Sequence, residues 1–152
     1  MKRFHLHMEQ RLPASASEIF RFFSDAHNLE TLTPRWLGFR VLTPSPIVLQ
    51  KGAVIDYRLK LHGIPLRWQS EITAWEPPYR FVDEQRKGPY RLWIHTHTFE
   101  SQKGGTLTRD DVEYAVHGGS LIQRWFVQPD LRRLFAHRQQ QLTKIFGNPP
   151  IP

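Results

Sequence analysis

The stretch Trp75–Glu100, WEPPYRFVDEQRKGPYRLWIHTHTFE, contains two strand-like runs joined by a short loop. Residues 79–85 and 90–101 are rich in aromatic and β-branched side chains, and RKGP between them is a loop of hairpin type. Within the second run, the alternating positions are Trp93, His95, His97 and Phe99. Because successive side chains of a strand point to opposite faces, this set shares one face. The stretch therefore predicts an antiparallel hairpin with two histidines on one face.

Further strand patterns lie on both sides of this hairpin. Residues 55–61 alternate apolar and charged side chains, and residues 66–75 and 106–116 also have the composition of strands. The sequence QKGG, residues 102–105, predicts a second hairpin loop. Alternation at residues 4–8 predicts one more strand near the N-terminus. The order predicts an antiparallel meander preceded by a single strand.

Helical patterns precede and follow the meander. Ser15 and Glu18 have the S-x-x-E spacing of a capping box, so a short helix begins there, and a second short helix covers residues 29–33. Apolar residues recur at helical spacing over residues 131–146. Pro129 suits the first turn of this long helix, with a shorter helical piece before it.

A long amphipathic meander needs a cover for its apolar face, and the last helix is the only predicted element large enough. A curved sheet around one helix leaves a cavity between them. The sequence therefore predicts an α+β domain over residues 1–147 with room for a small molecule. A loose tail, residues 148–152, is expected to follow.

Composition narrows the class of protein. The 152 residues carry a net charge of +7 and contain no cysteine, which excludes disulfides, thiolate metal sites and a cysteine nucleophile. No apolar run approaches the length of a membrane span, about 20 residues, so we expect a cytoplasmic protein. The charge favours anionic partners such as a membrane surface, but nucleic acid is not expected, because no track of stacking aromatics accompanies it. One basic group is interpreted as a solvated helix face: Arg124, Arg132, Arg133, Arg138 and Lys144.

The chain resembles the START-like, helix-grip superfamily of polyketide cyclases, lipid carriers and plant pollen allergens (SRPBCC). The resemblance rests on PASASEIFRFFSDAHNLETLTP, on the stretch 75–100, on GGTLTRDDVEY and on LRRLFAHRQQQL. Its most specific elements are FVDEQ, GPY and W-x-H-x-H-x-F. It implies a curved antiparallel sheet of six to seven strands around a long C-terminal helix, two short helices after the first strand, and a deep hydrophobic pocket. It implies no single reaction, because function depends on the site rather than on the fold.

The QKGG hairpin predicts cross-strand neighbours for the histidine strand: His97 with Asp110, His95 with Val112, and Trp93 with Tyr114. A carboxylate beside an imidazole raises its pKa and fixes its tautomer. Three interpretations stay open: a structural cluster of hydrogen bonds, a ligand-anchoring or acid–base site of His97, Asp110 and His95, and a metal site. The metal site is disfavoured, because Glu100 points to the opposite face and no motif supplies a fourth ligand. No metal or other cofactor is predicted.

The RKGP hairpin allows two registers that differ by one residue. One register turns Asp83 inward beside Trp93 and places Phe81 beside His95, and the other turns Asp83 outward. The family resemblance favours the inward one. The predicted ligand-binding residues are Tyr57, Trp68, Asp83, Gln85, Trp93, His95, His97, Phe99, Val112 and Tyr114.

Three functions are compatible with these residues. The leading hypothesis is the binding of a small hydrophobic ligand, lipid-like or polyketide-like, whose polar or acidic end is held by His95 and His97. The first alternative is an enzyme of cyclase or dehydratase type, with His97 as general base, Asp110 to orient it, and His95 or Tyr114 as proton donor. The second alternative is a lipid carrier that contacts anionic membranes. The oligomeric state stays open.

Overall fold

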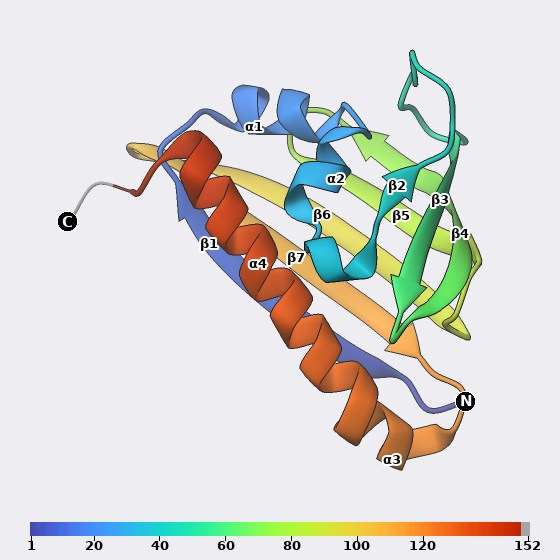
Figure 1. The fold of residues 1–152 in the computed structure, drawn as a ribbon. Helices are drawn as coiled ribbons and strands as arrows, with labels where there is room; N and C mark the ends of the chain where they lie inside the picture. Colours follow the sequence, from blue (N-terminus) through green and yellow to red (C-terminus); the bar gives the residue numbers. More distant parts are fainter. Residues whose placement is uncertain (150–152) are drawn as a thin grey trace.

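One antiparallel sheet of seven strands wraps around a long C-terminal helix in the computed structural model, which describes residues 1–149 (Figure 1). The strands are β1 (Phe4–Leu12), β2 (Arg40–Val41), β3 (Val54–Leu61), β4 (Ile64–Glu76), β5 (Arg80–Lys87), β6 (Leu92–Gln102) and β7 (Gly105–Ala115). The helices are α1 (Ala16–Phe23), α2 (Asn28–Leu32), the 3-10 turn η1 (Arg35–Leu37), α3 (Gly119–Ile122), the π-helical segment η2 (Gln123–Val127) and α4 (Gln128–Phe146). The predicted α+β helix-grip fold is confirmed. Of the predicted tail, residues 150–152 lie outside the described residues.

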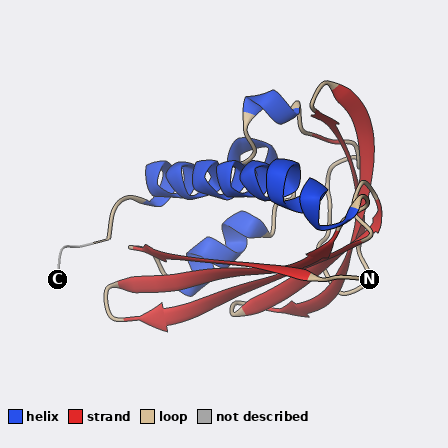
Figure 2. Cartoon of the chain, turned by 90° about the horizontal axis from the view of Figure 1, so that it is seen from below, coloured by secondary structure: helices blue, strands red, loops and turns tan. Residues whose placement is uncertain are grey.

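The sheet order is β1-β7-β6-β5-β4-β3-β2, so the strands from β2 to β7 form the predicted meander. The N-terminal strand β1 pairs with β7 at the end of the meander. The register of β4 with β5 shifts twice: Arg86 is an extra residue of β5 where Gln69 is followed by Ser70, and Thr73 is an extra residue of β4 between Ile72 and Ala74. Bulges bend a strand and increase its twist, and Figure 2 shows the sheet bending around the long helix.

The β6–β7 hairpin has the predicted register. Its turn contains Gly104 at φ 82°, a left-handed value that favours glycine. His97 pairs with Asp110, and His95 pairs with Val112. The QKGG loop therefore sets the position of both histidines relative to β7.

The β5–β6 hairpin differs from both predicted registers. Asp83 pairs with His95 rather than with Trp93, so it points inward as favoured, but the loop is two residues longer. The amide of Gln85 spans this loop, donating to the carbonyl of Tyr90 at 2.8 Å and accepting from its N–H at 3.1 Å. These two bonds take the place of backbone hydrogen bonds between β5 and β6. The pairing of the two strands therefore ends further from the turn.

The predicted N-terminal helices are also present. The hydroxyl of Ser15 accepts a hydrogen bond from the backbone N–H of Glu18 at 3.2 Å, which caps α1 as the S-x-x-E spacing predicts. α2 and η1 follow within a few residues, and η1 ends at Gly38, which has φ 53°. The segment from α1 to η1 covers part of the sheet that α4 leaves open.

The C-terminal helix is longer than predicted, because α3, η2 and α4 follow one another without a break. Pro129 lies in the first turn of α4, as predicted, directly after the π-helical segment η2. Leu131 and Phe135 pack in one apolar cluster with β6 and β7, and Leu142 packs in another with α1. Arg138 lies between them on the same buried face. Within the described residues, no helix combines the length and the hydropathy needed to cross a bilayer.

Candidate functional site

A cavity of about 180 Å³ lies between the concave side of the sheet, α4 and the segment from α1 to η1. Its walls are mostly apolar and include Phe23, Leu32, Leu37, Ile55, Tyr57, Leu59, Trp68, Ile72, Phe81, Trp93, Leu131, Leu134 and Phe135. Polar wall residues include Asp83, His95, His97 and Arg138. An apolar cavity of about 150 Å³ can hold a benzene molecule. This cavity therefore has room for at least a ring-sized apolar group beside a polar one.

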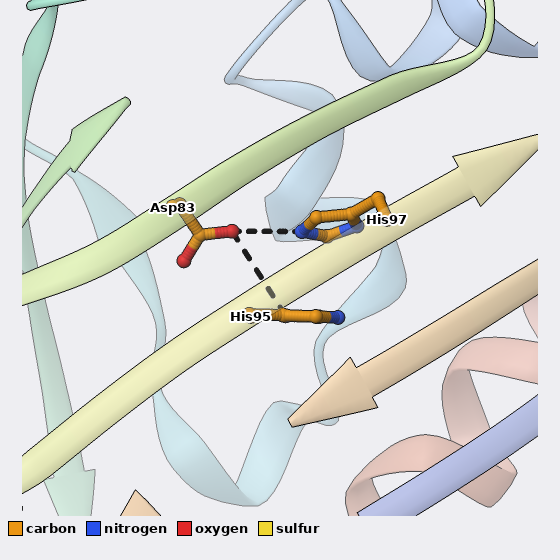
Figure 3. A group of neighbouring side chains, drawn as sticks. All are labelled: Asp83, His95 and His97. Carbon is orange, nitrogen blue, oxygen red and sulfur yellow. Dashed lines mark hydrogen bonds and ion pairs between the residues drawn. The ribbon is translucent and has the colours of Figure 1, made fainter. Parts of the chain in front are cut away.

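Asp83, His95 and His97 lie together at the wall formed by β5 and β6 (Figure 3). The two histidines are two residues apart on β6, so they project to the same face. Nε2 of His97 lies 2.7 Å from Oδ2 of Asp83, and Nδ1 of His95 lies 3.9 Å from the same oxygen. One carboxylate oxygen therefore faces both imidazole rings.

Asp110 of β7 and Arg138 of α4 complete this arrangement, and we refer to the five residues as the polar cluster. Nε2 of His95 lies 2.8 Å from Oδ1 of Asp110. Nη2 of Arg138 lies 3.4 Å from that oxygen and 3.3 Å from Nδ1 of His97. Arg138 is only 9% exposed, and within the described part of the chain its Nε has no hydrogen-bond partner. A buried donor without an acceptor is costly, so an oxygen that reached this nitrogen after a shift of the Arg138 side chain would be stabilised.

His97 is held in its neutral form. Its ring stacks on Phe81 and on His95, with centroid distances of 3.9 Å and 3.6 Å. Burial lowers the pKa of His97 well below its ordinary value, and the charges of His95 and Arg138 lower it further. With its proton on Nε2, the neutral ring donates to Asp83 and accepts from Arg138 at Nδ1. Both ring nitrogens are then satisfied.

The two carboxyl groups of the cluster are shifted in opposite directions. Burial raises the pKa of Asp83, and the charges of His95 and Arg138 offset only part of this effect. Burial acts on Asp110 too, but the charge of Arg138 and the hydrogen bond from His95 outweigh it, so the pKa of Asp110 lies well below its ordinary value. Asp110 is therefore the persistent carboxylate of the cluster, and Asp83 is the member that takes up a proton more readily.

The cavity wall contains most of the predicted ligand-binding residues, namely Tyr57, Trp68, Asp83, Trp93, His95 and His97. The other four predicted residues, Gln85, Phe99, Val112 and Tyr114, do not line this cavity. Gln85 spans the β5–β6 loop, Phe99 packs against α1, and Val112 and Tyr114 lie beneath η2 and α4. The last three do point to the inward face of the sheet, but helices cover that part of it.

His97 lies opposite Asp110 in the sheet, as predicted, but its ring is closer to the carboxylate of Asp83 than to that of Asp110. Its Nε2 lies 2.7 Å from Asp83, whereas its Nδ1 lies 3.5 Å from Asp110. The prediction for Arg138 is corrected, because the charge pattern assigns it to a solvated face, yet the structure buries it in the cluster. Its spacing from Leu131 and Leu142 matches the apolar face of the helix, and that periodicity is the signal that reveals it.

Asp83, His95 and His97 are also able to supply three ligand atoms that lie within 4.8 Å of one another, as a metal ion requires. A divalent cation would replace the hydrogen bond between Asp83 and His97. It would also meet the positive charge of Arg138, which lies against His97. The arrangement therefore suits the polar group of an organic ligand better than a cation.

Comparisons with known proteins agree on the fold. A model of the family described as polyketide cyclase / dehydrase and lipid transport matches residues 12–143. Among solved structures, protein CV1439 from Chromobacterium violaceum is 14% identical, with 94% of this chain and 97% of that chain covered and a TM-score of 0.74. Major latex-like protein 151 from Panax ginseng is 10% identical over 99% of both chains, with a TM-score of 0.71. Protein Ms6760 from Mycobacterium smegmatis is 18% identical, with 93% and 89% covered and a TM-score of 0.66. No curated protein matches the chain.

Proposed function

We propose that this chain, which belongs to the polyketide cyclase/dehydrase and lipid transport family, uses its cavity to bind a small hydrophobic molecule with an acidic or other oxygen-bearing polar group. The observation that carries the proposal is a mostly apolar cavity with a buried arginine in its wall. Apolar walls supply affinity for the body of a ligand, and a few placed polar groups fix its orientation.

Arg138 is the proposed anchor for the polar end of the ligand. One of its terminal nitrogens is shared between Asp110 and His97, while its Nε is without an acceptor within the described residues. A carboxylate or carbonyl oxygen would accept from this donor after a shift of the Arg138 side chain that turns Nε toward the cavity, and a charge-assisted bond of this kind is among the stronger hydrogen bonds. Asp83, once protonated, would be a second donor to the same group.

Competitive binding with a matched ligand pair tests this role. Phenylnaphthylamine, a neutral hydrophobic fluorophore, would fill the cavity, and naphthoic acid or naphthylmethanol would displace it. The wild-type protein should bind the acid more tightly than the alcohol, by about tenfold or more, because only the acid forms a charge-assisted bond with Arg138.

Arg138→Met should remove this preference while phenylnaphthylamine still binds. Arg132→Met, at an exposed position of the same helix, is the matched control and should change nothing. A folded wild-type protein that binds neither the fluorophore nor the naphthalene compounds would contradict the proposal.

Proton abstraction next to a carbonyl group is the second candidate function, and the raised pKa of Asp83 in the cavity wall favours it. Both nitrogens of His97 are occupied by hydrogen bonds, which leaves Asp83 as the better base. The C–H proton would pass to the Asp83 carboxylate, and the electron pair would move onto the carbonyl oxygen, which Arg138 would stabilise.

Hydrogen exchange tests this reaction without knowledge of the natural substrate. An aromatic β-diketone incubated with the protein in deuterated water should gain deuterium at its central carbon faster than in buffer. Asp83→Asn should abolish the acceleration. Equal exchange in the presence of wild type and Asp83→Asn would leave ligand binding as the only supported function of the cavity.

A further inference from the structure

The helical segment before α4 has its polarity reversed. Leu121, Ile122, Trp125 and Phe126 are 71%, 40%, 67% and 55% exposed, whereas Gln123 between them is only 7% exposed. The amide of Gln123 points inward and donates to the hydroxyl of Tyr114 at 3.0 Å. A surface helix of a globular protein normally buries its apolar side chains and exposes its polar ones. Here the buried residue is the polar one. The exposed apolar side chains are therefore arranged as in a helix that contacts a partner on this side.

These four residues form one continuous feature, which we call the apolar stripe. Their spacing of one, three and one residues keeps them within about 140° of the helix circumference. The segment includes η2, a π-helical turn, and π-helical turns occur frequently at functional sites. Contiguous exposed apolar groups of this kind mark contact surfaces rather than ordinary exposed side chains.

The surroundings of the apolar stripe are basic. Residues 118–129 contain no aspartate or glutamate and include Arg124, whose guanidinium lies 5.8 Å from the centre of the Trp125 ring. Nζ of Lys2 lies 3.3 Å from Oγ of Ser120, so the N-terminal strand brings a second positive charge to this place. The next acidic residue in the chain, Asp130, lies 2.7 Å from Nε2 of His62.

We propose that the apolar stripe docks the protein on an anionic lipid bilayer. Tryptophan, phenylalanine and leucine on one face with basic residues beside them is the composition of helices that lie in the membrane interface. Arg124 and Lys2 would meet anionic headgroups while the apolar side chains enter the region of the acyl chains. A second copy of the chain fits less well, because residues 118–129 offer no carboxylate to pair with Arg124 of the other copy.

The apolar stripe is also close to the cavity along the helix. Asp130 and Leu131 line the cavity, and they lie about one helical turn after Phe126 along the helix. Docking would therefore bring the cavity-lining part of α4 to the membrane surface, where a hydrophobic molecule could be exchanged. Docking itself does not depend on the proposed ligand: the surface binds vesicles whether the cavity is filled or empty.

Vesicle flotation tests the proposal directly. Phosphatidylcholine vesicles that contain phosphatidylglycerol should carry the wild-type protein upwards at low salt, and pure phosphatidylcholine vesicles should carry much less. The double variant Trp125→Ala/Phe126→Ala should weaken the association by more than about tenfold, because two large apolar groups no longer enter the interface. Arg124→Gln should weaken it by a smaller factor and reduce its dependence on salt.

Matched controls separate this surface from general stickiness and from misfolding. Tyr79→Ala and Val48→Ala remove apolar groups that are exposed elsewhere and should float like the wild type. All variants should keep the wild-type melting temperature and bind phenylnaphthylamine in the cavity, so a failure of docking is distinguishable from a failure of ligand binding.

Two results would overturn the proposal. One is an absence of flotation by the wild type on anionic vesicles at low salt, and the other is equal flotation by wild type and Trp125→Ala/Phe126→Ala. A concentration-dependent dimer of the wild type, lost in that double variant without any effect on flotation, would assign the apolar stripe to a second copy instead.

Discussion

His97 forms its close hydrogen bond with Asp83 on β5, although Asp110 lies directly opposite it on β7. His95, which is paired with Asp83 in the sheet, bonds in turn to Asp110. The hydrogen bonds thus cross the backbone register, and Arg138 contacts both an imidazole and a carboxylate where they meet. The crossing links three strands and α4 in one buried polar network, so a change in one member should affect the others.

The neutral state of His97 predicts how stability depends on pH. The pKa of His97 is lowered in the folded protein. Below about pH 6.5, His97 is therefore protonated in the unfolded chain but stays neutral in the folded chain. The free energy of unfolding should therefore fall as the pH is lowered from about 7 to 5, by up to about 1.4 kcal/mol per pH unit from this residue. Urea unfolding at several pH values measures this slope, and His97→Gln should flatten it.

The raised pKa of Asp83 changes the free energy of unfolding with pH in the opposite direction to His97. Its contribution must therefore be removed from the comparison. Its stabilising effect is complete below the unfolded pKa and is lost as the pH rises through the folded pKa. Wild-type His97 and His97→Gln are therefore best compared in an Asp83→Asn background. His5→Gln, at an exposed position, is the control. Identical slopes with His97 and with glutamine would show that His97 titrates normally in the folded protein.

Arg138 and Asp110 should be strongly coupled in stability. Arg138→Met keeps much of the side-chain volume but leaves a buried carboxylate without its positive partner, so a loss of about 3 kcal/mol is expected. Asp110→Asn leaves Arg138 uncompensated in the same way. In a double-mutant cycle by urea unfolding, the double variant should lose less than the sum of the single losses, by about 1–3 kcal/mol.

An exposed pair gives the reference for that cycle. Arg3 and Glu113 lie 2.5 Å apart at the surface, where ion pairs contribute less than about 1 kcal/mol. If the buried pair shows no more coupling than this exposed pair, Arg138 does not compensate Asp110 in solution.

The cavity itself can be reduced in size. Ala26 is almost fully buried and lines it, so Ala26→Leu should place three further carbon atoms in the space for a ligand. Affinity for phenylnaphthylamine should fall by about tenfold or more, while overpacking should cost stability no more than about 1–3 kcal/mol. Ala14→Leu, against the core but outside the cavity lining, is the control. Unchanged affinity in Ala26→Leu would place the bound fluorophore elsewhere.

The turn between β6 and β7 predicts an unusual ranking of two glycines. Gly104 has a left-handed φ of 82°, so Gly104→Ala should cost about 1–2 kcal/mol. A Cβ atom at Gly105 would lie only 2.1 Å from the carbonyl oxygen of Leu12 in β1. Gly105→Ala should therefore destabilise the protein more than Gly104→Ala, because the end of β1 must move. Thermal unfolding of both variants checks the order, and the reverse order would mean that β1 lies further from the turn.

Local signals in the sequence predict most of the fold. The glycines of QKGG restrict the turn so closely that the register of β6 with β7 follows from them. The β5–β6 loop is different, because its length depends on the Gln85 amide bonding to the backbone of Tyr90. A side chain that replaces ladder hydrogen bonds leaves no periodic pattern, so neither predicted register is right.

The site is less predictable than the fold, because it depends on which helix covers which part of the inward face. Phe99 and Tyr114 share that face with His95 and His97, but α1 and η2 cover them. Arg138 has the sequence appearance of a surface charge and is recognisable only by its place on the apolar side of α4. Long-range packing decides both cases, whereas strand alternation identifies only the face.

Mass spectrometry of the freshly purified protein, first under native and then under denaturing conditions, tests the central claim most directly. An apolar cavity with a polar anchor should retain a molecule from the host cell, seen as an added mass on the order of a few hundred daltons that is lost on denaturation. The added mass should be absent or strongly reduced in both Ala26→Leu and Arg138→Met. A native mass equal to that of the chain alone, together with no binding of phenylnaphthylamine or naphthoic acid, would contradict a ligand-binding function for the cavity.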